Sequence, residues 1–304
     1  MKILHWDEMF HPNFGYQINV LSKFQVKQGH EVVIMTSDKI EEHPTFAKFG
    51  NKVNIQFEDK KFSEKYGVKI IRLPIHRVIS GRVIYKRGYL KRIIDEKPDI
   101  MLCHTNDTLS GINITRNYRR FNFPIVFDNH MLEMASRNSF RKIFRFFFRK
   151  FVTPIITRNN LIVIRTQDDD YVNKQLGVPS RLTPFISFGS DTTIFKPDKR
   201  IREEFRNANG INSDDFVVIY AGKLTEAKGA KLLADAIKQK FLTNREIVFI
   251  VVGNAKGQYE VEALSIMQQS ENKIIHFPTQ KYDNLPEFYQ ASDLCLFPKQ
   301  CSLS

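Results

Sequence analysis

The stretch that decides the fold is the opening of the chain, MKILHWDEMFHPNFGYQINVLSKFQVKQGHEVVIMTS, residues 1–37. Residues 2–5 form a short apolar run typical of a strand, and apolar residues then recur at helical spacing over residues 18–24. Gly29 ends that helix, and the β-branched run at residues 31–36 predicts a second strand. A strand, a helix and a strand in so short a stretch predict parallel pairing in a doubly wound α/β sheet.

The same alternation of strands and helices continues along the chain. Before residue 187 it predicts strands at 68–73, 99–104, 124–128 and 161–165 and a helix at 82–96. After the turn-rich segment SFGSDTTIFKPD, residues 187–198, it predicts strands at 216–220, 247–252, 273–277 and 294–297 and helices at 229–240 and 259–269. We therefore expect two Rossmann-like domains with parallel sheets, residues 1–186 and 187–304. The second sheet would lack its closing helices, so we expect the sequence to end before that domain is complete.

The composition bounds the choice of partners. The chain has 304 residues, of which 42% are hydrophobic and 26% charged, and its formal net charge is +13. That mixture is typical of globular domains and excludes a mainly disordered chain. The basic excess indicates an anionic partner: nucleic acid, a phosphorylated ligand or an anionic membrane surface. Nucleic acid is not expected, because the basic residues are not interleaved with recognisable stacking motifs.

Cysteines, histidines and apolar runs bear on the compartment. Three cysteines without metal-ligand spacing argue against a disulfide framework and favour a reducing compartment. No apolar run approaches the ~20 residues of a membrane span, and the opening run is too short for a secretory signal. We expect a cytoplasmic protein, peripheral to the inner face of the cell membrane. The eight histidines include no pair at ligand spacing, so we expect no metal.

Two candidate sites in the first half follow strands, where ligands of open parallel sheets bind. In HPNFGY, residues 11–16, Gly15 would let the backbone approach a ligand just before a helix. The loop has no G-x-G-x-x-G pattern, which argues against a dinucleotide oxidoreductase. His130 follows the strand at 124–128 and is a candidate for contacting a sugar hydroxyl or moving a proton. A purely structural role for this histidine is the alternative.

A third candidate is the loop AGKLTEAKG, residues 221–229, directly after the first strand of the second half. Gly222 allows close approach of the backbone. Lys223 and Lys228 put two cations beside the start of the helix expected from Gly229. Loop, charge and position together predict a diphosphate-binding site, and two solvated surface lysines are the alternative.

A fourth candidate is the stretch RNSFRKIFRFFFRKF, residues 137–151, which predicts an amphipathic helix. Its basic arc comprises Arg137, Arg141, Lys142, Arg145 and Arg149. Its opposite stripe, which core packing would explain, comprises Phe140, Ile143, Phe144, Phe147, Phe148 and Phe151. Phe146 falls within the basic arc, which favours contact with an anionic bilayer surface or a lipid-phosphate acceptor.

Taken together, these stretches resemble the family 4 retaining glycosyltransferases, whose GT-B fold has two Rossmann-like domains facing a cleft. The resemblance spans nearly the whole chain and keeps the family's order of segments. It rests on residues 1–37, the family's first β-loop-α-β unit; ISFGSDTTIFKP, 186–197, its interdomain G-x-D-x-x-x-F-x-P segment; YAGKLTEAKGAKLLADAI, 220–237, its G-R-x(4)-K-G phosphate loop; and HFPTQKYDNLPEFYQASDLCLFPKQ, 276–300, the stretch before its donor-binding carboxylates.

The resemblance implies roles for individual residues. Lys228 matches the family lysine that holds the donor diphosphate, and Lys223 stands where the family usually has arginine, which loses bidentate geometry. Gly15 matches the loop near the donor phosphate and acceptor, and His130 stands where the family has a histidine near the transferred sugar. Backbone contact with the nucleotide base is implied for Phe277 and Pro278, and Gly222 belongs to the phosphate loop.

The implied activity is transfer of a hexosyl group, with retention, from a nucleotide diphosphate sugar to an acceptor hydroxyl, without metal or other cofactor. The implied acceptor is a glycan or lipid-linked glycan, as in cell-surface polysaccharide or glycolipid assembly. One alternative is a truncated, non-catalytic nucleotide- or membrane-binding fragment. It is motivated by Ser302, which stands near the family's first donor-binding glutamate, while the second would fall beyond Ser304. A GT-B-fold sugar-nucleotide epimerase or phosphorylase is the other alternative.

Overall fold

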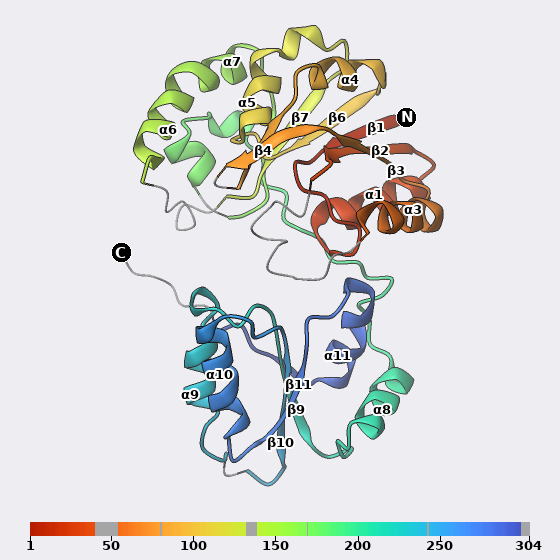
Figure 1. The fold of residues 1–304 in the computed structure, drawn as a ribbon, viewed down its shortest axis with the longest axis vertical. Coiled ribbons are helices and arrows are strands. Elements are labelled where there is room, and N and C mark those ends of the chain that lie inside the picture. Colours follow the sequence, from red (N-terminus) through yellow and green to blue (C-terminus); the bar gives the residue numbers. More distant parts are fainter. Residues whose placement is uncertain (40–53, 80, 132–138, 169, 242, 299–304) are drawn as a thin grey trace. The chain divides into compact units, whose positions relative to one another are not determined.

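The computed structural model describes residues 1–39, 54–79, 81–131, 139–168, 170–241 and 243–298 (Figure 1). The chain divides into two compact units, Met1–Gly189 and Ser190–Ser304. The turn-rich segment at residues 187–198 predicts a boundary between Ile186 and Ser187, close to this division.

The first unit is built on a six-stranded parallel sheet in the order β3-β2-β1-β6-β7-β8. Its strands are β1 (Lys2–Trp6), β2 (Glu31–Ser37), β3 (Lys69–Leu73), β6 (Ile100–His104), β7 (Ile125–Asn129) and β8 (Val163–Arg165). The strand order reverses between β1 and β6, and ligands of open α/β sheets bind beyond the carboxyl ends of the strands at such a point.

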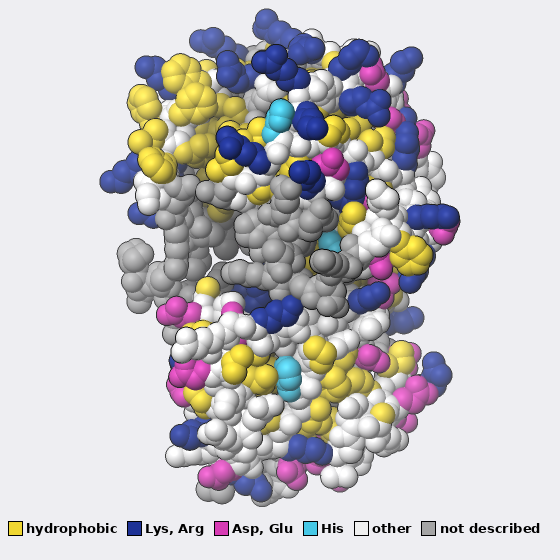
Figure 2. Space-filling view, in the orientation of Figure 1, with side chains coloured by type: hydrophobic (Ala, Val, Ile, Leu, Met, Phe, Trp, Pro, Cys, Tyr) yellow, Lys and Arg dark blue, Asp and Glu magenta, His cyan; other side chains and the backbone are white. Residues whose placement is uncertain are grey.

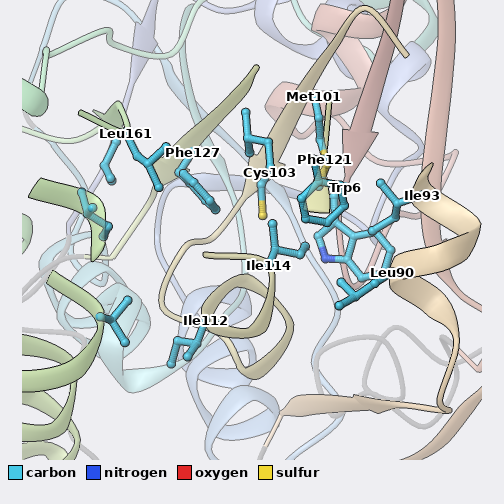
Figure 3. Packing of buried hydrophobic residues seen from close by; sticks show 14 of the residues in the cluster. Trp6, Leu90, Ile93, Met101, Cys103, Ile112, Ile114, Phe121, Phe127 and Leu161 are labelled. Atoms are coloured by element: carbon cyan, nitrogen blue, oxygen red, sulfur yellow. The ribbon is translucent and has the colours of Figure 1, made fainter. Parts of the chain in front are cut away.

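Helices cover both faces of this sheet. They are α1 (Gln17–Lys27), α3 (Ile55–Tyr66), α4 (Tyr89–Asp95), α5 (Leu109–Arg116), α6 (Arg141–Phe147), the π-helical η4 (Phe148–Val152) and α7 (Thr153–Arg158). Because successive strand side chains point to opposite faces, the side chains of β2 pack into two hydrophobic clusters, one on each face of the sheet. Val33 and Met35 pack in the cluster that includes α4, α5 and α7, part of which Figure 3 shows. Val32 and Ile34 pack against α1 and α3. Strands buried on both faces account for the continuous apolar runs of the sequence.

One expected helix is wrong. Instead of a helix over 82–96, the chain forms an antiparallel hairpin of β4 (Ile75–Ile79) and β5 (Arg82–Tyr85), followed by α4. Gly88 separates β5 from α4 with a φ of 93°, a left-handed conformation that glycine adopts without steric cost. A glycine inside the expected helix was therefore the signal of a break.

The second unit has a four-stranded parallel sheet in the order β11-β10-β9-β12. Its elements are α8 (Lys199–Ala208), β9 (Phe216–Ala221), the 3₁₀ turn η7 (Glu226–Lys228), α9 (Ala230–Ala236), β10 (Ile247–Val252), α10 (Gln258–Gln268), β11 (Lys273–Phe277), α11 (Leu285–Ala291) and β12 (Leu294–Cys295). Val218 and Tyr220 of β9 pack in the cluster with α9 and α10, whereas Val217 and Ile219 pack in the cluster with α8 and α11. The strand order reverses between β9 and β12.

The expected fold class, α/β with two parallel sheets, is confirmed. In detail, α9 ends at Ala236 rather than at residue 240, and β12 is shorter than the expected strand at 294–297. Within the ranges described above, no helix combines the length and hydropathy that a bilayer-spanning segment needs.

Candidate functional site

A chain of buried hydrogen bonds crosses the carboxyl ends of β1, β6 and β7. His5 Nδ1 lies 3.0 Å from His104 Nε2, and His104 Nδ1 lies 2.6 Å from Asp128 Oδ2. The other carboxylate oxygen of Asp128, Oδ1, lies 3.1 Å from His130 Nε2. His5, His104 and Asp128 are almost fully buried, whereas 29% of the His130 side chain is exposed. The predicted site residue His130 is thus the open end of a buried network.

The partners of the network fix where its protons lie. His5 Nε2 faces Gln25 Oε1 at 2.6 Å and must donate to that carbonyl oxygen. A neutral His5 then accepts at Nδ1, so that His104 donates from Nε2 to His5 as well as from Nδ1 to Asp128. With both nitrogens protonated, His104 is an imidazolium paired with the Asp128 carboxylate.

The pKa shifts agree with this arrangement. Burial, and then the neighbouring His104, lower the pKa of His5 to about 3, which keeps that ring neutral. Burial opposes the charge on His104, but the Asp128 carboxylate outweighs it and raises the His104 pKa. Burial would likewise raise the Asp128 pKa, yet the charge and hydrogen bonds of His104 and His130 hold it well below its ordinary value.

Three neighbouring side chains contact the ring of His130. Asp128 takes Nε2, Phe188 stacks on the ring at 5.2 Å between centroids, and Thr166 Oγ1 lies 2.8 Å from Nδ1. The Thr166 hydroxyl also lies 3.0 Å from the carbonyl oxygen of Asn129 and can donate to either acceptor. Nδ1 is therefore the nitrogen of His130 whose partner can change, and the one suited to meet a ligand hydroxyl.

Two residues beside this network, Thr105 and Asn106, are not predicted from the sequence as site residues. Thr105, directly after β6, has a φ of 73°, which is costly for a β-branched residue. Its amide donates to Asp128 Oδ1 at 3.1 Å, so the backbone in this conformation adds a hydrogen bond to the Asp128 carboxylate. The side chain of Asn106 is buried, and among the described residues its Nδ2 has no acceptor. The available signal was the polar run His104–Asp107 at the end of an expected strand.

The loop that contains Gly15 is ordered by its own contacts. The ring of His11 stacks on Phe14 at 4.4 Å, and the carbonyl oxygen of His11 accepts from Asn19 Nδ2 at 2.9 Å. Burial, and then the charge of Arg72, lower the pKa of His11 to about 4. Gly15 itself is exposed just before α1, in the position that the sequence predicts.

The loop after β9 places both predicted lysines at the carboxyl end of that strand. Lys223 and Lys228 are exposed, and the carbonyl oxygen of Lys223 accepts from the Tyr220 hydroxyl at 2.7 Å. Lys228 ends η7, and Gly229 follows with a φ of 69°. A Cβ on Gly229 would lie 1.7 Å from the carbonyl oxygen of Pro298, in the segment after β12. Only glycine fits there, so the loop is locked at the point where the strand order reverses.

The ends of β10 and β11 complete this edge. A Cβ on Gly253 would lie 2.1 Å from the carbonyl oxygen of Gly222, so the two loop backbones are in direct contact. Gly253 N donates to the carbonyl oxygen of Phe277 at 2.9 Å. The ring of Phe277 packs edge-on against Phe288 at 4.9 Å, which leaves its backbone and the exposed Pro278 at the edge. The structure thus gathers Gly222, Lys223, Lys228, Phe277 and Pro278 along one edge of the second sheet.

The amphipathic stretch differs from expectation. Arg137 lies outside the described residues. Arg141 and Arg149 are exposed, whereas Arg145 is half-buried and donates from Nη1 to Gln175 Oε1 at 2.7 Å. Packing of the aromatic stripe into the core holds only for Phe144 and Phe148. It is wrong for the exposed members of that stripe, Phe140, Ile143, Phe147 and Phe151.

A metal site is not expected from the sequence, yet donor atoms of His104, Asp128 and His130 all lie within 4.8 Å of one another. Each Asp128 oxygen already faces an imidazole N–H at hydrogen-bond distance. These atoms form a hydrogen-bond network, and the expectation of no metal stays a prediction.

Comparisons with known proteins give a family match over the segment that contains the loop after β9. A family model described as glycosyl transferases group 1 matches residues 201–301. The lipopolysaccharide 1,2-N-acetylglucosaminetransferase of Salmonella typhimurium is 28% identical over 120 residues, and EpsD of Bacillus subtilis is 25% identical over 210 residues. These matches cover 37% and 66% of this chain, but 30% and 52% of the two relatives. The chain thus spans about half or less of the curated relatives it matches.

Solved structures share the fold across the chain. HepE of Anabaena in complex with UDP matches with a TM-score of 0.67 at 18% identity, over 99% of this chain and 75% of HepE. HepE is also known in complex with UDP-glucose. A glycosyltransferase of Rickettsia africae matches with a TM-score of 0.65 at 14% identity, over 98% of this chain and 73% of that one. The structural neighbours show a GT-B fold, and the sequence matches support the glycosyltransferase superfamily.

Proposed function

We propose that this chain belongs to an enzyme that transfers a hexosyl group from a nucleotide diphosphate sugar to an acceptor hydroxyl with retention. The observation that carries the proposal is the loop after β9, with exposed Lys223 and Lys228 at the reversal of the strand order. The backbone of this loop depends on Gly229, and the loop carries both lysines. The match of this segment to glycosyl transferases group 1 supports the same reading.

The chemistry follows from the charge that develops on the donor. As the bond from the anomeric carbon to the diphosphate breaks, its electron pair leaves with the diphosphate, and negative charge grows there. Lys223 and Lys228 would offset that charge, and electrostatic stabilisation of this kind is usually the largest catalytic term. The acceptor hydroxyl attacks the anomeric carbon from the face that the diphosphate leaves and gives its proton to a diphosphate oxygen. This order of chemical steps needs no metal and no protein nucleophile.

In the first unit, we assign His130 the role of a hydrogen-bond partner for a hydroxyl of the transferred sugar. Its Nδ1 can exchange Thr166 for a sugar hydroxyl, while Asp128 keeps Nε2 and so fixes the ring. Gly15 would lie near the donor phosphate and acceptor. The acceptor that we propose is a glycan or lipid-linked glycan in polysaccharide or glycolipid assembly at the cytoplasmic face of the membrane. The relative named as a lipopolysaccharide 1,2-N-acetylglucosaminetransferase supports this choice.

The test is the substitution Lys228→Ala in the full-length protein, assayed for transfer from a panel of nucleotide diphosphate sugars. Loss of one preorganised charge-stabilising group should lower kcat roughly 100-fold. The matched control is Lys238→Ala, because Lys238 is also an exposed lysine and lies beyond the far end of α9. Unchanged turnover in Lys228→Ala would refute the assignment.

Two further readouts separate the alternatives. NMR of the first-formed product gives the anomeric configuration, and an inverted product would contradict retention. Nucleotide binding by the unaltered protein without any transfer or donor hydrolysis would favour a non-catalytic binding module instead. Isomerisation of the donor without an acceptor would indicate an epimerase.

A further inference from the structure

A band of exposed apolar side chains runs along α6 and η4. Its members are Phe140, Ile143, Phe146, Phe147 and Phe151, with exposed fractions of 69%, 67%, 64%, 37% and 51%. Figure 2 shows the hydrophobic side chains gathered over α6, with Lys and Arg side chains around them. We call these five residues, four phenylalanines and one isoleucine, the aromatic band. Monomeric proteins rarely expose apolar side chains in so contiguous a group without a partner for them.

The helix is packed so that this band faces outward. Phe144, Phe148 and Val152 recur every four residues and lie against the core of the first unit, with Phe148 and Val152 fully buried. A spacing of four drifts around an α-helix of 3.6 residues per turn. The wider π turn of η4 offsets that drift and brings Val152 back to the buried face. Because the buried face is already filled by these side chains, the aromatic band cannot turn inward.

Within residues 139–151, all charged side chains of the segment that carries the aromatic band are cations. Residues 139–151 contain Arg141, Lys142, Arg145, Arg149 and Lys150 and no aspartate or glutamate. All but Arg145 are exposed. Lys150 Nζ lies 5.7 Å from the ring centroids of both Phe146 and Phe151. Its aliphatic stem can therefore share the apolar environment of the rings while its ammonium group reaches a polar surface.

We propose that the aromatic band and its cations form a docking surface for an anionic lipid bilayer. Exposed aromatic rings on one side of a helix, bordered by lysine and arginine, are the pattern of helices that lie in the membrane interface. The cations match the negative surface potential of anionic lipids. This inference concerns the first unit alone and does not depend on the proposed transfer activity.

Two other occupants fit the surface less well. A second copy of the chain would bring two cationic borders together, and like charges across an interface are unfavourable. A phosphorylated soluble glycan would use the cations but leave five apolar side chains without a role. A bilayer with anionic headgroups uses both features.

The experiment is flotation of the full-length protein with vesicles of phosphatidylcholine alone, or of equal amounts of phosphatidylcholine and phosphatidylglycerol. We expect retention by the anionic vesicles, little retention by the neutral ones, and release in high salt. The double substitution Phe146→Ser with Phe151→Ser should weaken retention roughly tenfold or more. The double substitution Lys142→Gln with Arg149→Gln should do so by a similar factor on anionic vesicles.

Matched controls lie on α3 of the same unit. Phe57→Ser removes a ring that is 62% exposed, and Lys61→Gln removes an exposed cation, so both should leave retention unchanged. Fluorescence of Trp6, the only tryptophan and a buried one, reports whether each variant is folded. The proposal is overturned if anionic vesicles do not retain the unaltered protein. It is also overturned if they retain the folded band and cation variants as well as the unaltered protein. A dimer in light scattering that Phe146→Ser with Phe151→Ser dissociates would overturn it too, because a second copy would then occupy the band.

Discussion

At the scale of single residues, the buried pair of His104 and Asp128 sets the behaviour of the candidate site. Replacing Asp128 by Asn removes the carboxylate that balances the His104 imidazolium. Removal of one partner from a buried ion pair costs about 3–5 kcal/mol, so we expect Asp128→Asn to lower the free energy of unfolding by about 3 kcal/mol. Urea unfolding measures this change. The control Asp95→Asn breaks an exposed pair with Lys91 and should change the free energy of unfolding by less than about 0.5 kcal/mol.

The same pair predicts a dependence on pH. The Asp128 pKa is depressed, so its contribution to stability is present above the ordinary carboxyl pKa and is lost as the pH falls below it. The His104 pKa is raised, so its contribution is complete below the ordinary imidazole pKa and is lost as the pH rises through the folded value. The cost of Asp128→Asn should therefore be greatest near about pH 5 and shrink in alkaline solution. A cost that is independent of pH would mean that His104 is neutral.

How far residues could be predicted from the sequence depends on whether their environment is local. His130 and the two loop lysines stand directly after predicted strands, and parallel strands end at a common edge, so their placement was foreseeable. His5 and His104 meet across 99 residues of sequence, because β1 and β6 are neighbours only in the folded sheet. The strand order that joins them is not encoded in the spacing of either strand.

At the scale of elements, the loop after β9 depends on one glycine. Gly229→Ala would force a left-handed φ of 69° on alanine and place Cβ 1.7 Å from the carbonyl oxygen of Pro298. We expect a loss of unfolding free energy of roughly 2 kcal/mol or more, together with weaker nucleotide binding, because the loop must shift. Calorimetry measures both effects.

The matched control is Gly210→Ala in the same unit. Gly210 has a similar φ of 62°, but the nearest atom to its added Cβ, Lys273 Nζ, is 3.9 Å away. This variant carries the backbone strain without the collision, so it should lose only about 1 kcal/mol and bind nucleotide normally. Equal losses in the two variants would show that the contact with Pro298 does not matter.

Helices and strands could be predicted from the sequence where a single hydrophobic pattern fits the segment. Buried parallel strands are apolar throughout and stand out, whereas Arg82–Tyr85 and Tyr89–Asp95 join into one plausible helical pattern that only Gly88 interrupts. The aromatic band shows the other limit. Periodicity identifies an apolar stripe on a helix, but whether a neighbouring element covers that stripe is decided by packing elsewhere in the chain.

At the scale of the whole molecule, each unit has its own buried core. None of the four apolar clusters of the described residues combines side chains from both units. Each sheet also carries its own candidate site at its carboxyl edge. A ligand held by one unit should therefore stabilise that unit first, since binding stabilises only the state that binds.

The position of the single tryptophan makes this testable. Trp6 is buried in the first unit, so its fluorescence follows the unfolding of that unit alone, whereas circular dichroism follows both. If the proposed transfer is correct, a nucleoside diphosphate should bind the loop after β9 in the second unit, and UDP serves as the probe. At about 100 times its Kd it should stabilise that unit by about 2.7 kcal/mol and raise its unfolding temperature. The Trp6 transition should then stay in place while part of the dichroism transition moves upward, and Lys228→Ala should abolish the movement. Equal shifts of both signals would instead show that the two units unfold as one cooperative body, or that the nucleotide also binds the first.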